Sequence, residues 1–495
     1  MAEIMHSPPI CSTLPVFSGF RPAFMLRQKP VGRTTSCLGV QNPSTLTFPG
    51  LSEAELSTTS LPFKVRKNAP ELIAPATPTP RELKLLSDID DQEGFRNLNS
   101  IILLYPKNSK MGKTNPASVI REALAKVLVY YYPLAGRIKE FVPARKLVVD
   151  CNAKGVAFVE ADANVTLEKV RMILHPPFPC LGEFVYDFDG PNVTIDSPLM
   201  YFQVTRLLCE GFVVTFKINH VMCDGQGAAQ FLMAMTEMAQ GALAPSILPI
   251  WQRELLYARN PPRVTYPHPE YDQLGATKHK NITKNEMTQK SFFFGPVEMT
   301  ALRRAVPGTF KSCTTFEVLT ACLWRCRTIA LQPNPEEVMR LMMFVNTRAK
   351  FRPRFPKGYY GNCIVIPCAI STAEDLCNKP LGYALELVKK AKDSVTEEYV
   401  RSTADLMSIK GRPHYITTSS YIVSDHTRFR FNKLNFGWGE PIYSGYPIDD
   451  IQFPGVYNDY MYSTNDKGEP GIEVIIGMPI PSMEKFVKEL NIMLK

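Results

Sequence analysis

His220 and Asp224 stand four residues apart and are the side chains best suited to acid–base chemistry. The alternating residues 212–218 before them predict a β-strand with one buried face, and a turn through Gly225 and Gly227 leads into a helical pattern. A histidine at the exit of a strand can face a cleft, where an imidazole acts as a general base near neutral pH. Asp224 would orient the loop through an internal ion pair. The competing interpretation is a buried structural histidine followed by a helix cap.

A second unusual run lies far downstream, at residues 434–441, where two glycines flank Trp438. Glycines around an indole predict a tight loop whose backbone packs closely against another segment. Between the two runs, residues 345–351 and 356–362 again combine strand ends, glycine turns and aromatic side chains.

The elements that must position these residues are a mixture of helices and short strands in both halves of the chain. Amphipathic patterns predict helices over residues 119–129, 316–329 and 381–397, and apolar runs predict strands over residues 146–149, 156–160, 341–345, 363–367 and 473–477. A proline-rich stretch, residues 242–269, separates the halves. The pattern favours two mixed α/β layers joined by a long crossover, with a site where they meet.

Composition narrows the classes of partner. The chain has 495 residues, enough for two domains, and its net charge of +9 is spread along it without a dense Lys/Arg block, which argues against nucleic-acid binding. No apolar run approaches the roughly 18 residues of a membrane span. The twelve cysteines lack metal-ligand spacing, so we expect no metal site and core thiols in a reducing compartment. We interpret Cys223 as buried filler, and His414 and His426 as solvated surface residues.

The first sixty residues differ from all that follow. They are rich in Ser, Thr and Pro, and no acidic residue lies between Glu3 and Glu53. This composition is typical of an organellar transit peptide, although a disordered extension or a wrongly chosen start codon would look the same. We expect a cytoplasmic protein, or a plastid protein if residues 1–60 are a functional transit peptide.

Three motifs resemble those of the plant BAHD acyltransferases, which move an acyl group from a coenzyme A thioester to an alcohol or amine. His220-x-x-x-Asp224 matches the family's catalytic motif, Asn435-Phe-Gly-Trp-Gly439 matches its D-F-G-W-G motif, and Tyr132-Pro-Leu-Ala-Gly-Arg137 matches its Y-P-x-A-G-R turn. The resemblance covers residues 61–495. It is nearest to the benzyl alcohol O-benzoyltransferase group of alcohol acyltransferases, through runs at residues 70–75, 86–94, 246–249, 357–362 and 378–390.

The resemblance implies an α/β fold of two chloramphenicol-acetyltransferase-like domains, each a mixed sheet with helices. Residues 61–241 would form the N-terminal domain, residues 242–290 the crossover and residues 291–495 the C-terminal domain. A channel between the domains would admit acyl-CoA as a co-substrate and a small alcohol as acceptor. The resemblance implies no permanently bound cofactor, and we expect a monomer because one chain carries the whole site.

The resemblance also assigns roles. His220 would be the general base, while Asp224, Asn435 and Arg348 would hold the two motifs in place. Asn435 replaces the family's aspartate, which is thought to pair with an arginine that Arg348 matches, so the amide would bond Arg348 without contributing charge.

Three further residues complete the expected site. The Trp438 indole is a candidate oxyanion donor, with simple loop packing as the alternative, and Ser424 and Thr427 match positions near the pantetheine arm. The expected function is transfer of a benzoyl or short acyl group to benzyl or another small alcohol. There are two alternatives. The chain could transfer the acyl group to an amine, or it could be a catalytically impaired family member that acts as a binding protein.

Overall fold

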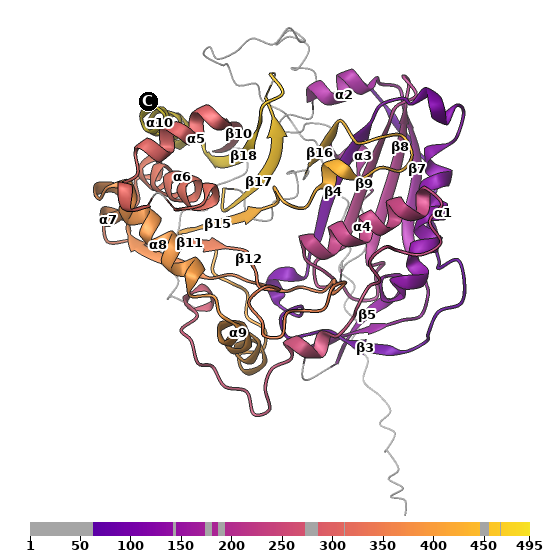
Figure 1. Cartoon of the computed structure of the whole chain (residues 1–495), viewed down its shortest axis with the longest axis horizontal. Coiled ribbons are helices and arrows are strands. Elements are labelled where there is room, and N and C mark those ends of the chain that lie inside the picture. The colour runs from indigo at the N-terminus through magenta and orange to yellow at the C-terminus, as the bar shows by residue number, and fades with distance from the viewer. Residues whose placement is uncertain are drawn as a thin grey trace, which may run out of the picture. The chain divides into compact units, whose positions relative to one another are not determined.

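Two mixed β-sheets with covering helices organise the computed structural model (Figure 1). It describes residues 63–141, 145–173, 181–186, 194–272, 286–310, 312–445, 455–465 and 467–495. The expected extension, residues 1–60, lies outside these ranges. Residues 62–495 form one compact unit.

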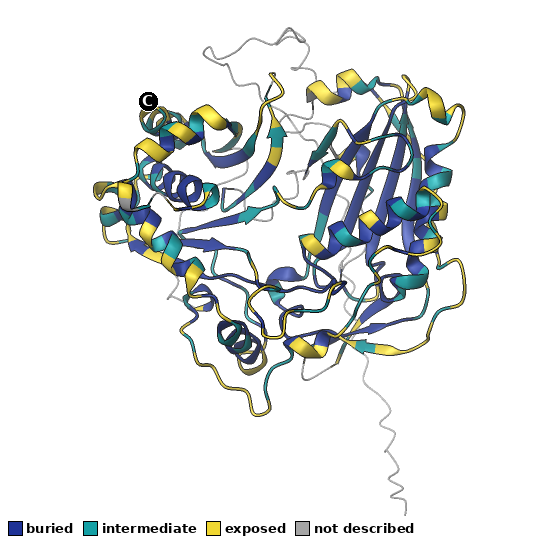
Figure 2. Cartoon of the chain, viewed as in Figure 1, coloured by how far each residue is buried: buried dark blue, intermediate teal, exposed yellow. Residues whose placement is uncertain are grey.

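The first sheet is built around a fully buried central strand. Its strand order is β1 (Val65–Lys67), β7 (Val156–Ala163), β8 (Met200–Leu207), β9 (Phe212–Asn219), β4 (Leu98–Tyr105) and β16 (Tyr443–Gly445), with β2 (Glu71–Ile73) beside β7. Every residue of β9 is buried (Figure 2), and β4 and β8 pair with its two edges. Two helices, α1 (Pro116–Tyr130) and α4 (Gly225–Ala239), pack against each other over this sheet. The short helices α2 (Leu167–Ile173) and α3 (Leu181–Phe184) belong to the same half.

The second sheet carries more helices. Its order is β10 (Met287–Phe294), β18 (Pro470–Pro479), β17 (Tyr457–Thr464), β15 (Ser420–Asp425), β11 (Val338–Met343) and β14 (Cys368–Thr372). The long helix α6 (Thr315–Leu331) packs against α8 (Leu381–Asp393) and α10 (Ile480–Met493), and the remaining helices are α5 (Pro296–Arg304), α7 (Ala373–Asn378) and α9 (Glu397–Ile409). Two small sheets complete the described fold: β12 (Val345–Asn346) with β13 (Ile364–Val365), and β3 (Leu83–Leu85) with β6 (Lys146–Asp150) and β5 (Arg137–Phe141).

One strand breaks the division into halves. β16 comes from the C-terminal part of the chain but pairs antiparallel with β4 of the first sheet. The segment before it packs into the first core through Phe436 and Trp438, and the Tyr105 hydroxyl donates a hydrogen bond to the Leu434 carbonyl at 2.7 Å. Residues 434–445 therefore belong structurally to the N-terminal half.

Most predicted elements are confirmed, and two predictions were wrong at their ends. The helix expected over residues 381–397 ends at Asp393, and Glu397 already begins the next helix, α9, which the Thr396 side chain caps by accepting from the Tyr399 N–H. The strand expected over residues 363–367 stops at Val365. Pro367 has no N–H with which to continue the ladder, and pairing resumes as β14 against β11.

Candidate active site

His220 follows β9 directly, and hydrogen bonds from other segments hold its backbone in place. Its N–H donates to the Asn97 carbonyl at 2.9 Å, and the Asn219 N–H donates to the Leu199 carbonyl at 2.9 Å. The Asn362 side chain, from the second half of the chain, donates to the His220 carbonyl at 2.8 Å. The residue's backbone is therefore fixed by both halves.

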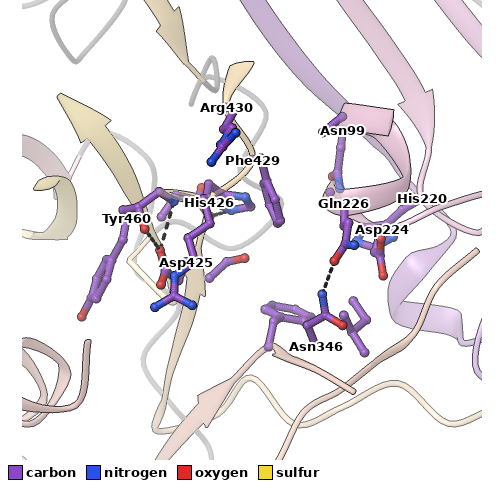
Figure 3. A pocket seen from close by; sticks show the side chains of 18 of the residues that line it. Asn99, His220, Asp224, Gln226, Asn346, Asp425, His426, Phe429, Arg430 and Tyr460 are labelled. Carbon is purple, nitrogen blue, oxygen red and sulfur yellow. Dashed lines mark hydrogen bonds and ion pairs between the residues drawn. The ribbon is translucent and has the colours of Figure 1, made fainter. Parts of the chain in front are cut away.

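The imidazole of His220 lies flat on the Phe95 ring, with centroids 4.4 Å apart and planes 4° apart, and it lines a large cavity (Figure 3). Burial lowers the pKa of His220, against smaller opposing effects from its own carbonyl, the Asp224 carboxylate and Asn362; charge on His426 lowers it further. The ring is therefore neutral near neutral pH, as a general base must be before it accepts a proton.

Asp224 caps helix α4 and forms an ion pair at the same time. One oxygen, Oδ1, accepts from the Gly227 N–H at 2.9 Å and Arg348 Nη2 at 3.0 Å; the other, Oδ2, accepts from Arg348 Nη1 at 2.7 Å and the Cys363 N–H at 3.0 Å. Burial opposes ionisation, but the Arg348 guanidinium and the two N–H groups together hold the pKa of Asp224 below its usual range. The ion pair expected for Asp224 is present, and its partner is Arg348.

Gly227 shows why this helix start needs glycine. A Cβ at residue 227 would lie 2.0 Å from the Tyr360 carbonyl oxygen, so the helix could not approach the 358–362 loop with any larger residue there. The loop in turn supplies the Gly361 carbonyl that accepts from Arg348 at 2.7 Å. The first turn of α4 and this loop are therefore locked together.

A buried polar cluster behind the His220 turn was missed by the sequence patterns. Asp90 and Arg253 are both fully buried and form an ion pair of 2.7 Å, and Arg253 also donates to the Met222 carbonyl at 2.7 Å. Asn362 donates to Asp90 from both its backbone and its side chain, each at 2.9 Å. The cluster holds the turn through the carbonyls of Met222 and His220, which accept from Arg253 and Asn362. Asp90 and Asn362 lie in runs that resemble the acyltransferase group, but nothing local in the sequence indicated that they meet.

The expected contact between Asn435 and Arg348 is wrong. The Asn435 side-chain oxygen accepts from the Gly437 and Gly439 N–H groups at 2.8 and 2.9 Å, inside its own loop. Both glycines have positive φ, 110° and 97°, which lets the two N–H groups converge on one oxygen. Arg348 is already engaged by Asp224, so an amide at residue 435 removes no partner from it.

The expectation that Trp438 donates to an oxyanion is also wrong. Its indole packs edge-on against Phe212, with ring centroids 5.2 Å apart, inside the first core. Phe212 begins β9 and His220 follows its end, so at about 3.3 Å per residue their backbones lie on the order of 26 Å apart, and Trp438 does not line the cavity of His220. The alternative, packing of the loop, describes what Trp438 does.

The cavity that His220 lines has a volume of about 1340 Å³. Typical sites for one small ligand measure roughly 300–1,000 Å³, so this one has room for two substrates together. Its walls come from both halves: β4 and the start of α4 on one side, and β15, β17 and the N-terminus of α6 on the other. Ser424 and Thr427, matched by resemblance to the pantetheine region, both line it.

Aromatic side chains line much of this cavity, and one of them, Phe95, stacks on His220. Phe95, Phe344, Tyr415, Tyr457 and Phe429 all line it, and the two tyrosine hydroxyls are hydrogen-bonded to each other. Such a wall suits a flat, apolar substrate group next to the base.

The interpretation of His426 as a solvated surface residue is wrong. Its side chain is 11% exposed, lines the cavity and places Nε2 2.9 Å from Asp459 Oδ1. The reason is strand pairing: the parallel register of β15 and β17 sets Ser424 opposite Asp459, which brings the carboxylate beside the histidine. His414 is likewise partly buried, with Nδ1 2.6 Å from the Tyr415 carbonyl oxygen.

Cys223 is buried beside Asp224, and burial raises the pKa of its thiol, as expected for filler and not for a nucleophile.

Among the residues that the structure describes, no group of three or more His, Cys, Asp or Glu side chains could hold a metal ion. Within the same ranges, none of the helices has both the length and the apolarity needed to cross a bilayer.

Comparison with known proteins places the chain among acyltransferases. The model of the Transferase family matches residues 63–493. Benzyl alcohol O-benzoyltransferase of Petunia hybrida is 54% identical over 439 residues, covering 88% of this chain and 95% of that protein. An alcohol acyl transferase 1 allele of Malus domestica is 50% identical over 436 residues (87% and 94%), and 13-hydroxylupanine O-tigloyltransferase of Lupinus albus is 49% identical over 446 residues (88% and 96%).

Solved structures show the same fold. Vinorine synthase has a TM-score of 0.66 and 23% identity, covering 87% of this chain and all of that one. F. graminearum TRI101 complexed with coenzyme A and deoxynivalenol has a TM-score of 0.62 and 16% identity, covering 82% of this chain and 96% of that one. These matches confirm the predicted α/β fold with two sheet-rich domains.

Proposed function

The chain belongs to the Transferase family, the BAHD acyltransferases, and from that premise we propose that it transfers a benzoyl or short acyl group from coenzyme A to benzyl alcohol or another small alcohol. The observation that carries the proposal is a neutral histidine, stacked on Phe95, facing a cavity large enough for both substrates. The names of the similar proteins support the acyl-transfer reaction and the kind of alcohol.

In the proposed mechanism His220 takes the hydroxyl proton while the alcohol oxygen attacks the thioester carbonyl carbon. A C–O bond forms and the carbonyl oxygen becomes an oxyanion. When this intermediate collapses, the C–S bond breaks and the departing coenzyme A thiolate takes the proton from the His220 imidazolium. The proton taken from the alcohol ends on the coenzyme A thiol, and no covalent acyl-enzyme forms. A base so positioned contributes on the order of 10²–10⁴-fold in rate.

The other site residues would act by position. We propose that Asp224 and Arg348 hold the turn that carries His220, since their side chains bond each other and nearby backbone groups. Asn435 would hold its own loop. Ser424 and Thr427 would contact the pantetheine arm, which is supported by their place in the cavity wall.

The test is thiol release from benzoyl-CoA and acetyl-CoA with benzyl alcohol, comparing the wild type with His220→Ala. Alcohol-dependent release that falls by at least a hundredfold in folded His220→Ala is the expected result. Release that persists in the variant would exclude His220 as the base. Benzylamine in place of benzyl alcohol tests the amine alternative, because both acceptors would use the same base.

We also propose that the protein is a monomer, since one chain carries the complete set of site residues. We further propose that it acts in the cytoplasm. Size-exclusion chromatography with light scattering tests the monomer. A fusion of residues 1–60 to a fluorescent protein tests the plastid alternative: import into plastids would overturn the cytoplasmic assignment.

A further inference from the structure

Two arginines flank Phe429 in the loop after β15, and both Arg428 and Arg430 line the cavity (Figure 3 labels Arg430). Their side chains are exposed, and neither forms an ion pair or hydrogen bond with any residue that the structure describes.

The other charged groups of the cavity wall are engaged. Asp224 pairs with Arg348, Asp459 with His426, and Lys392 with Glu317. A further set of polar contacts occupies the remaining carboxylates and the buried lysine: Asp425 accepts from Thr427, Glu237 accepts from Ser246, and Lys217 has partners of its own. The two guanidiniums are therefore the charges in the described wall that remain available to a ligand.

The loop that presents them packs against the start of α4. A Cβ on Gly225 would lie 2.3 Å from the Phe429 ring, so this ring packs directly on the first residue of α4. Arg430 has φ 55°, a left-handed backbone conformation that is uncommon for a residue other than glycine. The two arginines therefore flank a ring that packs on the start of α4, where both halves meet.

We propose that Arg428 and Arg430 bind the phosphate groups of the acyl-CoA substrate. The inference rests on the proposed function, in which the acceptor is an uncharged alcohol and coenzyme A is the polyanionic substrate. A guanidinium presents paired N–H donors that match phosphate oxygens, and a charge-assisted pair of this kind is stronger than a neutral hydrogen bond. Phe95 and the other aromatic side chains of the cavity then take the uncharged groups, and Arg428 and Arg430 take the charged end of the thioester.

The experiment compares two thioesters that carry the same acyl group. Benzoyl-CoA has the phosphates, and benzoyl-pantetheine lacks them. Arg428→Gln and Arg430→Gln should each raise KM for benzoyl-CoA about tenfold, and the double variant about a hundredfold, with kcat and KM for benzoyl-pantetheine unchanged. Arg354→Gln is the matched control, because Arg354 is also exposed but does not line the cavity.

A second measurement needs no variant. Added salt screens exposed charges, so KM of the wild type for benzoyl-CoA should rise with ionic strength while KM for benzoyl-pantetheine stays constant. This readout does not depend on whether a variant folds, and a salt effect that is equal for the two thioesters would refute the inference. Arg428→Lys should keep part of the affinity, because it keeps the charge but not the paired donors.

Three results would overturn the inference: equal KM changes for both thioesters, no change for either, or a salt effect that is the same for both. Failure of the proposed function looks different, since the wild type would then turn over neither thioester. In that case calorimetric titration with coenzyme A and with pantetheine still tests the arginines. Weaker binding of coenzyme A alone in the variants supports the inference, and equal binding refutes it.

Discussion

Replacing Asp224 by asparagine keeps the shape of the side chain and removes its charge. The carboxylate makes four contacts, two to each oxygen, and an amide keeps only one oxygen. The amide nitrogen would then face either Arg348 Nη1 and the Cys363 N–H, or Arg348 Nη2 and the Gly227 N–H. All of these are donors, so two contacts are lost in either orientation.

The magnitude follows from burial. Asp224 is 3% exposed and Arg348 12% exposed, so the variant leaves a mostly buried guanidinium without its counter-ion. Breaking a buried ion pair from one side costs about 3–5 kcal/mol. That is a large share of the roughly 5–15 kcal/mol that stabilises a typical folded domain. We expect a lower urea midpoint, and a fall in kcat as well, because the turn that carries His220 loosens.

The assay is urea unfolding of four proteins: the wild type, Asp224→Asn, Arg348→Met and the double variant. The ion pair predicts that Arg348→Met costs less in the Asp224→Asn background than alone, with a coupling of more than about 1 kcal/mol. Asp393→Asn is the control, since its i, i+4 pair with Lys389 is exposed and should leave the midpoint unchanged. Additive effects of the two substitutions would refute the reasoning.

The same ion pair makes the stability of the folded protein depend on pH. The pKa of Asp224 is lowered in the folded protein, so its contribution is fully present above the unfolded pKa, about 3.9, and is lost as the pH falls through the folded value. The difference in unfolding free energy between the wild type and Asp224→Asn should therefore be constant near neutral pH and shrink below about pH 4. A difference that stays constant in acid would contradict the assignment.

Three further outcomes can be measured directly. Burial lowers the pKa of His220, so the acid limb of kcat/KM should have its midpoint below the ordinary imidazole value of about 6.5; a midpoint above it would show that the base is not in this environment. Phe95→Leu removes the ring stacked on His220 and should lower kcat about two- to tenfold, the equivalent of about 0.5–1.5 kcal/mol, with little change in KM. Asn435→Asp can accept the same two N–H groups and should retain full activity, whereas Asn435→Ala should lose about 1–2 kcal/mol of stability; a large gain in kcat for Asn435→Asp would mean that the amide impairs the enzyme.

The sequence predicted the local parts of this site well. The strand before His220, the turn through two glycines and the helix after it follow from periodicity and glycine spacing, and all three are present. The break between α8 and α9 could also have been anticipated. Thr396 followed by two glutamates is a helix-start signal that outweighs a continuous apolar stripe.

What the sequence did not predict are pairings between distant segments. Arg348 was expected beside residue 435, yet its ion-pair partner lies 124 residues away at Asp224. Asp90 and Arg253 are 163 residues apart, and neither has a local pattern that marks it as buried. Burial of a charge depends on tertiary packing, which periodicity does not encode.

The route of β16 limits how this protein can be recombined with its relatives. A chimera joined in the crossover would take residues 434–445 from one parent and β4, the strand that β16 pairs with, from the other. The same junction would separate Asp224 from Arg348 and Asp90 from Asn362. The exchangeable module is thus not a half of the gene. It is the N-terminal half together with residues 434–445 and with matching residues at positions 348 and 362, because β16, the Asp224 ion pair and the Asp90 contacts all cross the junction.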